Sequence, residues 1–209
     1  MRKSYTQAGL DVSEVCDDPL DQFRRWFDQA RQSDLPEWME INAMTLSTAG
    51  SDGAVTSRVV LLKGIEDDRF VFFTNYESVK ARQIAENAAV SLCFFWPHLE
   101  RQVGVQGRAV RTDRRRSEAY FHSRPRESQL GAWASRQSSV IADREVLQER
   151  FAALDTQYQG EVVPLPDHWG GYDVTPERIE FWQGRPSRLH DRIAYVKTAD
   201  AWQRDRLSP

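Results

Sequence analysis

The sequence predicts an α+β protein whose centre is an antiparallel, Greek-key-like β-barrel with helices at its periphery. Short β-branched and aromatic runs separated by turn residues follow one another through residues 42–111 and again through 169–207. Most helical patterns fall before the first run or together between residues 112 and 158, so they do not alternate with the strands. A parallel sheet would need a crossover helix after most strands, and antiparallel pairing is therefore the expected arrangement.

Length and composition fit one soluble globular domain. The chain has 209 residues, of which 40% are hydrophobic and 28% are charged. Residues 1–16 are polar and are expected to form a mobile arm, followed by a single domain over 17–209. The formal net charge of −3 argues against nucleic acid or a membrane as a partner, and no apolar run nears the roughly 20 residues of a span. Cys16 and Cys93 stand alone and the first residues do not resemble a signal peptide, so a cytoplasmic location is expected.

The first half of the chain opens with a helix and continues mainly as strands. Asp18 is a typical N-cap, Pro19 suits the first helical turn, and apolar residues then recur on one helical face to residue 32. The runs that follow are rich in β-branched and aromatic residues, and Ser78 can cap one short helix among them. The expected strands are 42–48, 58–63, 69–74, 90–96 and 101–111, with the short helix at 79–86.

The second half is helical first and extended afterwards. Asp113 and Asp143 are N-cap residues, and Pro125 suits the start of a helix between them. The expected helices are 114–122, 125–133 and 143–158, and the expected strands are 169–174, 178–183, 192–197 and 201–207. Gly104 and Gly107, in the last strand of the first half, indicate a bulge or a close backbone approach.

The run from Ser57 to Lys63 organises the chain. It is apolar and β-branched, with a cation near each end, and is expected to be a strand buried along most of its length. Side chains alternate along a strand, so Arg58 and Lys63 should point to opposite sides and could serve two different anions. The alternative is that both cations simply extend into solvent over packed stems.

Three other stretches combine cations with hydrogen-bond donors. Ser78 and Lys80 begin a helix, where free backbone N–H groups and a lysine favour a phosphate, although an ordinary cap is the simpler interpretation. Tyr120, Arg124 and Ser128 are spaced four apart and could face one anion together, or form a solvated basic face. In an extended chain, Arg188, His190 and Arg192 would share one face.

The sequence contains no pattern typical of a self-sufficient catalytic site. There is no Ser-His-Asp arrangement, no cluster with metal-ligand spacing and no glycine-rich nucleotide loop, so no metal is expected. Catalysis should then rest on a bound organic cofactor, with the protein supplying anion-binding groups and orientation. Two phosphate-sized sites and abundant aromatic residues suggest two phosphorylated aromatic molecules, of which one is a cofactor and the other a substrate.

Taken together, ten short motifs resemble those of the pyridoxamine (pyridoxine) 5′-phosphate oxidase family. The motifs are Arg58–Lys63, Phe73–Asn75, Glu100–Val103, Tyr120–Arg126, Gln129–Trp133, Gln137–Ser139, Trp169–Gly171, Ile179–Gly184, Arg188–Arg192 and Asp205–Pro209. The resemblance covers the chain from about Pro19 to its end, and the N-terminal arm shows a weaker similarity. It implies an FMN-binding split β-barrel that works as a homodimer, with the flavin at the subunit interface.

The resemblance also implies a role for each matching residue. The expected FMN-binding residues are Arg58, Val59, Val60, Leu61, Leu62, Lys63, Phe73, Thr74, Lys80, Gln102, Gln137, Ser138, Trp182 and Arg192. The expected substrate-binding residues are Arg2, Tyr5, Lys63, Tyr120, Arg124, Ser128, Arg188 and His190. Among these, Arg188 and His190 are expected to be catalytic because they should flank the reacting carbon, while Arg2 and Tyr5 should close over the substrate.

The activity that the resemblance implies is oxidation of pyridoxamine or pyridoxine 5′-phosphate to pyridoxal 5′-phosphate. Oxygen accepts the electrons, hydrogen peroxide is released, and the amine substrate also gives ammonia. Two alternatives keep the fold: a flavin oxidase of phenazine biosynthesis, and a flavin- or pyridoxal-phosphate-binding protein without turnover. An RNA-binding module is the remaining alternative, which the run of three arginines at 114–116 supports only weakly because no aromatics are interleaved with it.

One position departs from the family pattern. Beside the lysine that should bind the FMN phosphate, the family usually has an arginine, and this chain has Val79. Loss of one charge-assisted hydrogen bond costs about 1.5–3 kcal/mol, or roughly tenfold to a hundredfold in affinity, if nothing compensates. Weaker FMN retention than is typical of the family is therefore expected.

Overall fold

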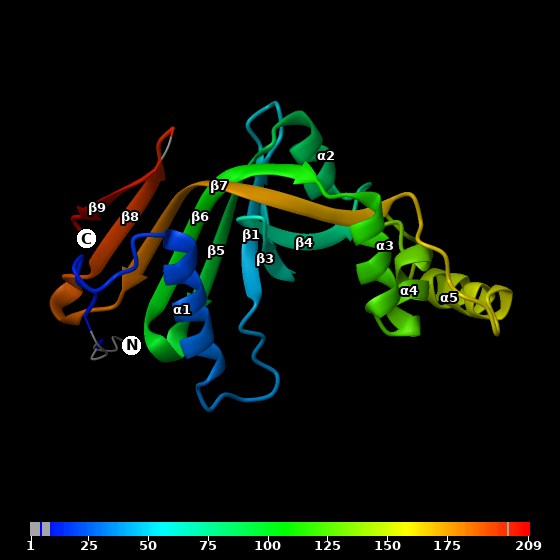
Figure 1. The fold of residues 1–209 in the computed structure, drawn as a ribbon. Coiled ribbons are helices and arrows are strands. Elements are labelled where there is room, and N and C mark those ends of the chain that lie inside the picture. Colours follow the sequence, from blue (N-terminus) through cyan, green and yellow to red (C-terminus); the bar gives the residue numbers. More distant parts are fainter. Residues whose placement is uncertain (1–4, 6–8, 200) are drawn as a thin grey trace.

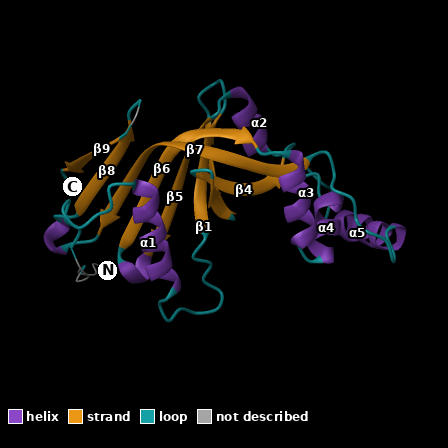
Figure 2. Cartoon of the chain, viewed as in Figure 1, coloured by secondary structure: helices purple, strands orange, loops and turns teal. Residues whose placement is uncertain are grey.

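The computed structural model describes residue 5 and residues 9–199 and 201–209; Arg2, one of the expected substrate-binding residues, lies outside them. Within this part of the chain, nine strands form one antiparallel sheet that curls strongly, and the helices lie around it (Figures 1 and 2). The strands are β1 (Ala43–Ala49), β2 (Val55–Leu61), β3 (Gly64–Glu66), β4 (Arg69–Asn75), β5 (Ala89–Trp96), β6 (Arg101–Arg111), β7 (Trp169–Gln183), β8 (Asp191–Lys197) and β9 (Trp202–Leu207). The helices are α1 (Pro19–Arg31), α2 (Val79–Glu86), α3 (Arg114–Ser123), α4 (Arg126–Ala134) and α5 (Glu145–Gln157).

The curl of the sheet follows from its strand order, which is β2-β1-β5-β6-β7-β4-β3 with β8 and β9 added beside β7. The two end strands of this order, β2 and β3, are neighbours in sequence. Leu62 N–H donates to the carbonyl of Asn42 before β1, whereas Lys63 N–H donates to the carbonyl of Val71 in β4. The chain thus crosses from one edge of the sheet to the other between two residues, which closes the barrel at this point.

Helix α1 covers the core of the sheet, as its apolar face predicts. Asp18 accepts a hydrogen bond from Leu20 N–H at 2.7 Å, so the predicted cap is present. Phe23 and Trp26 are almost fully buried, and the ring of Phe23 meets that of Phe94 at 4.9 Å, edge to face. Helices α3, α4 and α5 extend from the opposite end of the molecule (Figure 1). No helix in the described part of the chain has the length and apolar character that crossing a membrane requires.

The two strands predicted at 169–174 and 178–183 are one continuous strand, β7. Proline removes a ladder donor, and Pro176 would ordinarily end a strand. Here the register between β6 and β7 shifts: Gln106 pairs with Arg178 and Gly107 pairs with Pro176, which leaves Glu177 as an extra residue of β7. This bulge lets pairing continue past the proline. A Cβ on Gly107 would lie 2.1 Å from the Thr175 carbonyl oxygen, so the predicted close approach is confirmed there. Gly104 has no such neighbour, and the prediction is wrong for that residue.

The prediction that the strand from Ser57 to Lys63 is buried along most of its length is wrong. Strand β2 pairs only with β1 and alternates between exposed and half-buried residues, with 66% of Val59 exposed. The expectation that Arg58 and Lys63 point to opposite sides is wrong as well, because both line the same cavity. Strict alternation fails because β2 ends at Leu61, before the crossing that takes Lys63 to β4.

Candidate functional site

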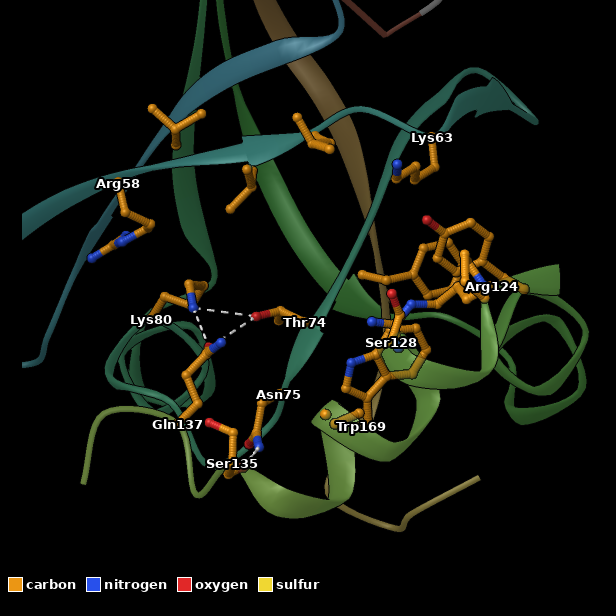
Figure 3. Close-up of a pocket in the computed structure, with 18 residues that line it drawn as sticks. Arg58, Lys63, Thr74, Asn75, Lys80, Arg124, Ser128, Ser135, Gln137 and Trp169 are labelled. Carbon is orange, nitrogen blue, oxygen red and sulfur yellow. Dashed lines mark hydrogen bonds between the residues drawn. The ribbon is translucent and has the colours of Figure 1, made fainter. Parts of the chain in front are cut away.

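A cavity of about 790 Å³ opens between β2, β4, α2 and the α3–α4 region (Figure 3). Its lining includes most of the expected cofactor residues and the expected substrate-phosphate set. The predicted residues that line it are Arg58, Val59, Val60, Leu61, Lys63, Phe73, Thr74, Lys80, Tyr120, Arg124, Ser128 and Gln137. Among its lining residues four are cations and none is Asp or Glu. A concave site with positive charge and no counter-ion in its wall is suited to an anionic ligand.

Lys80 lies at one end of the cavity, on the first turn of α2. Its Nζ donates to Gln137 Oε1 at 2.6 Å and to Thr74 Oγ1 at 3.2 Å (Figure 3). It also donates to Ser78 Oγ at 3.3 Å. Burial, and then the charge of Arg58, lower the pKa of Lys80 to about 8. All its protein partners are neutral oxygens, so the ammonium group is held in place without being neutralised.

Ser78 and Ser138 complete the helix end. Ser78 caps α2 as predicted, accepting from Ala81 N–H at 3.4 Å. The N–H of Val79 donates to Ser138 Oγ at 3.4 Å, which draws the loop after α4 onto the start of α2. Ser138 does not line the cavity itself, and it takes a left-handed φ of 70°. The α2 N-terminus therefore combines a lysine, a capping serine and a second hydroxyl from a distant loop.

Arg58 enters the same end of the cavity from β2. Its Nη1 donates to the Leu46 carbonyl at 3.1 Å and to Thr48 Oγ1 at 2.7 Å, and its Nη2 donates to Thr56 Oγ1. Burial lowers the pKa of the guanidinium. Like Lys80, Arg58 is fixed by uncharged oxygens. The two cations, one from the N-terminal end of α2 and one from β2, together form an anion site.

The other end of the cavity holds Lys63, Tyr120, Arg124 and Ser128, as expected. Tyr120 belongs to α3, Arg124 follows α3, and Ser128 lies in α4, so the four-residue spacing spans the junction of the two helices. The Arg124 guanidinium lies 4.7 Å from the centroid of the Trp169 ring, and its Nη1 is buried without a hydrogen-bond partner in the described structure. A buried guanidinium N–H with no acceptor is an opening for a ligand oxygen.

Aromatic rings form the wall beside this second cationic group. Phe73 stacks on Tyr120 with ring centroids 4.0 Å apart and an interplanar angle of 19°, and on Trp169 at 5.6 Å and 10°. Lys63 Nζ lies 5.7 Å from the centroid of the Tyr120 ring. The two ends of the cavity therefore offer separate anion sites with apolar strand and ring surface between them, which is the chemistry that a phosphorylated cofactor and a phosphorylated aromatic substrate require.

Leu62, an expected FMN-binding residue, is only 6% exposed, packs in the hydrophobic core and does not line the cavity. The other predicted residues form a second group, here called the turn cluster: Tyr5, Gln102, Trp182, Arg188, His190 and Arg192. Gln102 pairs with Trp182 across β6 and β7, and Trp182 pairs with Arg192 across β7 and β8. The ring of His190 lies 4.7 Å from that of Trp182, and Tyr5 meets it edge to face at 5.5 Å. His190 Nδ1 accepts from Arg185 N–H at 3.1 Å, which leaves the proton of a neutral imidazole on Nε2.

The expectation that Arg188, His190 and Arg192 share one face of an extended segment is wrong. Pro186–Arg188 form a 3₁₀ turn in which Ser187 and Arg188 take φ values of 58° and 64°. Extended structure resumes only at Asp191, where β8 begins. Arg192 is bound to Glu180, with Nε donating to Oε1 at 2.8 Å, whereas Arg188 is exposed on the turn.

The structure does not bring the turn cluster to the cavity within one chain. Trp169 lines the cavity and Trp182 belongs to the turn cluster, and both lie on β7, thirteen residues apart. At about 3.3 Å per residue, a strand covers roughly 40 Å over that distance, even if its twist shortens it somewhat. Figure 1 shows the helical region and the β8–β9 region at opposite ends of the molecule. One mononucleotide cannot bridge such a gap.

The prediction assigned no role to several residues that shape the cavity. Asn75, Ser135 and Trp169 line it, and the first and last of them lie in motifs that carry the family resemblance. Thr48 and Thr56, which hold Arg58, gave no signal, because only the pairing register of β1 and β2 places them beside it.

Comparison with known proteins agrees with this geometry. Residues 32–158 match the family model described as pyridoxamine 5′-phosphate oxidase, and residues 169–209 match the model described as the pyridoxine 5′-phosphate oxidase C-terminal dimerisation region. The pyridoxine/pyridoxamine 5′-phosphate oxidase of Rhodopirellula baltica is 54% identical, with 100% of this chain and 95% of the relative covered. The protein of the same name from Leptospira interrogans is 51% identical, with 100% and 97% covered.

Two solved structures show the same fold. PhzG from Burkholderia lata, solved with tetrahydrophenazine-1-carboxylic acid, is 28% identical and superposes with a TM-score of 0.90 over 99% of this chain and 100% of its own. An FMN-binding, pyridoxamine 5′-phosphate oxidase-related protein from Nostoc punctiforme is 14% identical, with a TM-score of 0.70 over 96% and 98%. The expected α+β split barrel is confirmed, and the chain belongs to the pyridoxamine 5′-phosphate oxidase family.

Proposed function

We propose that this chain is an FMN-dependent oxidase that converts pyridoxamine 5′-phosphate and pyridoxine 5′-phosphate to pyridoxal 5′-phosphate. Oxygen accepts the electrons and leaves as hydrogen peroxide, and the amine substrate also releases ammonia. The observation that carries the proposal is one cavity with two separate cationic ends, no carboxylate in its lining and aromatic rings beside the second end. Relatives of the same name at 51–54% identity over the whole chain support it.

The residues at the Lys80 end fit FMN. Arg58 and Lys80 supply cations for the phosphate, and Thr74, Gln137 and Ser138 supply neutral hydrogen-bonding groups beside them. Strand β2 from Val59 to Leu61, with Phe73 opposite on β4, offers apolar surface for a flat ring system. When bound, FMN supplies the two-electron acceptor chemistry that the side chains themselves lack.

At the other end, Lys63, Tyr120, Arg124 and Ser128 hold the substrate phosphate. Each offers a donor, and Arg124 has a buried Nη1 for which the described residues supply no acceptor. Fixing the phosphate at this distance from the reacting carbon uses remote binding energy to orient the pyridine ring. Tyr120 and Trp169, stacked around Phe73, limit the access of water from that side.

The turn cluster completes the cavity of a second copy of the chain. The family description of residues 169–209 as a dimerisation region supports a homodimer, and Trp182, Arg188, His190 and Arg192 all lie within that region. His190, with its Nε2 proton available, and Arg188 flank the pyridine ring and are the catalytic residues of the proposal. Tyr5 lies against His190 and covers the site.

Both cysteines of the chain are free, as is typical of a reducing compartment, and we infer a cytoplasmic location. Small molecules, namely the phosphorylated substrates and oxygen, are the partners beside the second subunit, and nucleic acid is not.

A phenazine-type oxidase is the second candidate, favoured by the TM-score of 0.90 to PhzG. The deciding experiment is an absorption spectrum of the protein with added FMN, followed by pyridoxine 5′-phosphate in air. The proposal expects aldehyde product and peroxide in equal amounts. A bound flavin that this substrate cannot reduce would favour the phenazine-type or carrier alternatives, and no flavin binding would refute the cofactor assignment.

A further inference from the structure

A hydrogen-bond network lies behind Arg58, on the side away from the cavity. Thr48 Oγ1 donates to Gln83 Oε1 at 2.6 Å, and Thr56 Oγ1 donates to the same oxygen at 2.7 Å. The two threonines belong to β1 and β2 and also accept from Arg58. Gln83 belongs to α2, is only 8% exposed, and is not among the residues that line the cavity.

The amide of Gln83 has only one orientation that satisfies this network. Its Nε2 donates to the Ala54 carbonyl at 3.0 Å, so Oε1 must face the threonines. An amide oxygen can only accept, and a hydroxyl has a single proton to give. Both threonine protons are therefore directed at Gln83, and the lone pairs of both hydroxyls are left for the guanidinium of Arg58.

The donor and acceptor directions in this network determine which N–H groups of Arg58 face the cavity. Nη1 uses its two protons on Leu46 and Thr48, and Nη2 uses one on Thr56. Of the five N–H donors of a guanidinium, two therefore remain for a ligand, and their direction is set by the three acceptors behind them. Without an acceptor at position 83, each threonine hydroxyl could rotate its proton toward Arg58 and stop accepting from it.

Gln83 also links the two cations of the Lys80 end. Lys80 and Gln83 are three residues apart on α2, so they lie on the same helical face. The same helix thus supplies one cation directly and orients the other through two hydroxyl groups of a neighbouring hairpin. The alternative is that Gln83 serves only to anchor α2 to β1 and β2.

We propose that Gln83 is a positioning residue for FMN binding, which acts by forcing Thr48 and Thr56 to accept hydrogen bonds from Arg58. The inference rests on the proposed function, because it takes FMN as the ligand of Arg58. It predicts that Gln83 affects cofactor affinity only while Arg58 is present, whereas a residue that merely anchors α2 would affect affinity with or without Arg58.

The test is a titration of FMN fluorescence with apoprotein, which needs no turnover. Gln83→Leu is expected to weaken FMN binding about tenfold, the scale of one misdirected charge-assisted hydrogen bond. In an Arg58→Ala background, titrated up to saturation, the same substitution is expected to change the FMN dissociation constant less than twofold, because nothing remains to be oriented. Gln22→Leu is the matched control. Gln22 lies in α1, is buried and accepts a hydrogen bond from Cys16 N–H, and replacing it should leave FMN affinity unchanged.

Thr56→Val provides a second route that conserves shape and suits a strand, should Gln83→Leu not fold. It is expected to weaken binding severalfold in the parent and not in Arg58→Ala. An equal loss in both backgrounds, or no loss in the parent, would overturn the positioning role while the parent still bound FMN. Absence of FMN binding by the parent itself would overturn the proposed function, and this inference with it.

Discussion

The cavity and the turn cluster use their arginines and lysines in opposite ways. In the cavity, the described hydrogen bonds of Lys80 and Arg58 all go to neutral oxygens, and the buried Nη1 of Arg124 has no acceptor among the residues that the structure describes. In and around the turn cluster, most of the cations are paired within the chain, as Arg192 is with Glu180 at 2.8 Å, whereas Arg188 is exposed on the turn. Cations without a counter-ion in the protein can bind an anionic ligand, whereas cations paired with carboxylates fix the local conformation.

Asp191 is the clearest example of the second use. Its Oδ2 accepts from Leu10 N–H at 3.0 Å and lies 3.5 Å from Arg185 Nε, while its Oδ1 accepts from Arg206 Nη1 at 2.7 Å. These bonds tie the turn to the N-terminal segment and to β9. We infer from this contrast that the cavity receives a small molecule, whereas the turn is held in a fixed shape that meets another surface.

Subunit complementation tests whether the cavity and the turn cluster serve one active site from two different chains. Arg124→Ala, in the cavity, and His190→Ala, in the turn cluster, are each expected to lower turnover about a hundredfold through loss of positioning. If both regions of one chain served one site, mixing the two variants would restore nothing. If each site draws on two chains, random pairing makes half of the dimers mixed, with one chain of each variant. Each mixed dimer has one intact site of its two, so the mixture should regain about a quarter of parental activity.

The assay is turnover after the two variants are unfolded, mixed and refolded together. The control pairs His190→Ala with Arg188→Ala, which both lie in the turn cluster and should not complement one another. A mixture that shows only the mean of the separate activities would contradict the two-chain site.

The pH dependence of FMN binding sharpens the contrast at the cavity. The free protein has a Lys80 pKa of about 8, lowered chiefly by burial, so this lysine loses its charge as the pH rises above 8. Phosphate bound beside it would favour the charged form and raise that pKa, so binding above pH 8 takes up a proton. Affinity is therefore expected to fall with rising pH above 8, by at most about tenfold per pH unit.

Fluorescence titrations between about pH 7 and pH 9.5 cover this range, where the FMN phosphate has already lost its second proton, with a pKa of about 6. Lys80→Met should bind FMN about tenfold to a hundredfold more weakly at pH 7 and should lose the dependence above pH 8. A parent affinity that stays constant over this interval would show that Lys80 does not meet the phosphate.

The smallest expected effect concerns Val79. Its side chain is 37% exposed at the first turn of α2, beside Lys80 and bonded through its N–H to Ser138. Val79→Arg adds a guanidinium at this helix end, and about tenfold tighter FMN binding is expected from one charge-assisted hydrogen bond. Val162→Arg, at an exposed valine that does not line the cavity, adds the same charge as a control. Equal affinities for Val79→Arg and the parent would refute the idea that this position limits cofactor retention.

Much of the fold could be predicted because local signals were strong. The N-caps at Asp18, Ser78 and Asp113 all accept the hydrogen bonds expected of them, and the 79–86 helix and the 101–111 strand have the predicted limits. The continuity of β7 could not be predicted, since it depends on how β7 pairs with β6 at the register shift between Gln106 and Gly107. The position of β2 at the edge of the sheet could not be predicted either, because an apolar run has the same sequence pattern whether another strand or a second subunit covers it.

For the site, the sequence predicted residue types better than their arrangement. The spacing of Tyr120, Arg124 and Ser128 was enough to place them together, because short helices on either side of Arg124 preserve the four-residue period. The prediction for the Arg188–Arg192 segment is wrong, because it takes the segment as extended, whereas Ser187 and Arg188 adopt left-handed conformations. Gln83 gave no signal at all, since its role follows only from the pairing of β1 with β2 and the packing of α2 against them.

The order of the strands also has a consequence for how the chain folds. Strand β7 lies between β6 and β4, so residues 70–75 find their sheet partner about a hundred residues later, at 169–174. Contacts this distant in sequence slow folding, because a long loop must be closed before any pairing energy is gained. On the ribosome, β4 would emerge long before its neighbour exists, with one edge open. Maturation of the barrel therefore awaits the C-terminal third of the chain, and premature termination before β7 would leave an aggregation-prone edge instead of a smaller working protein.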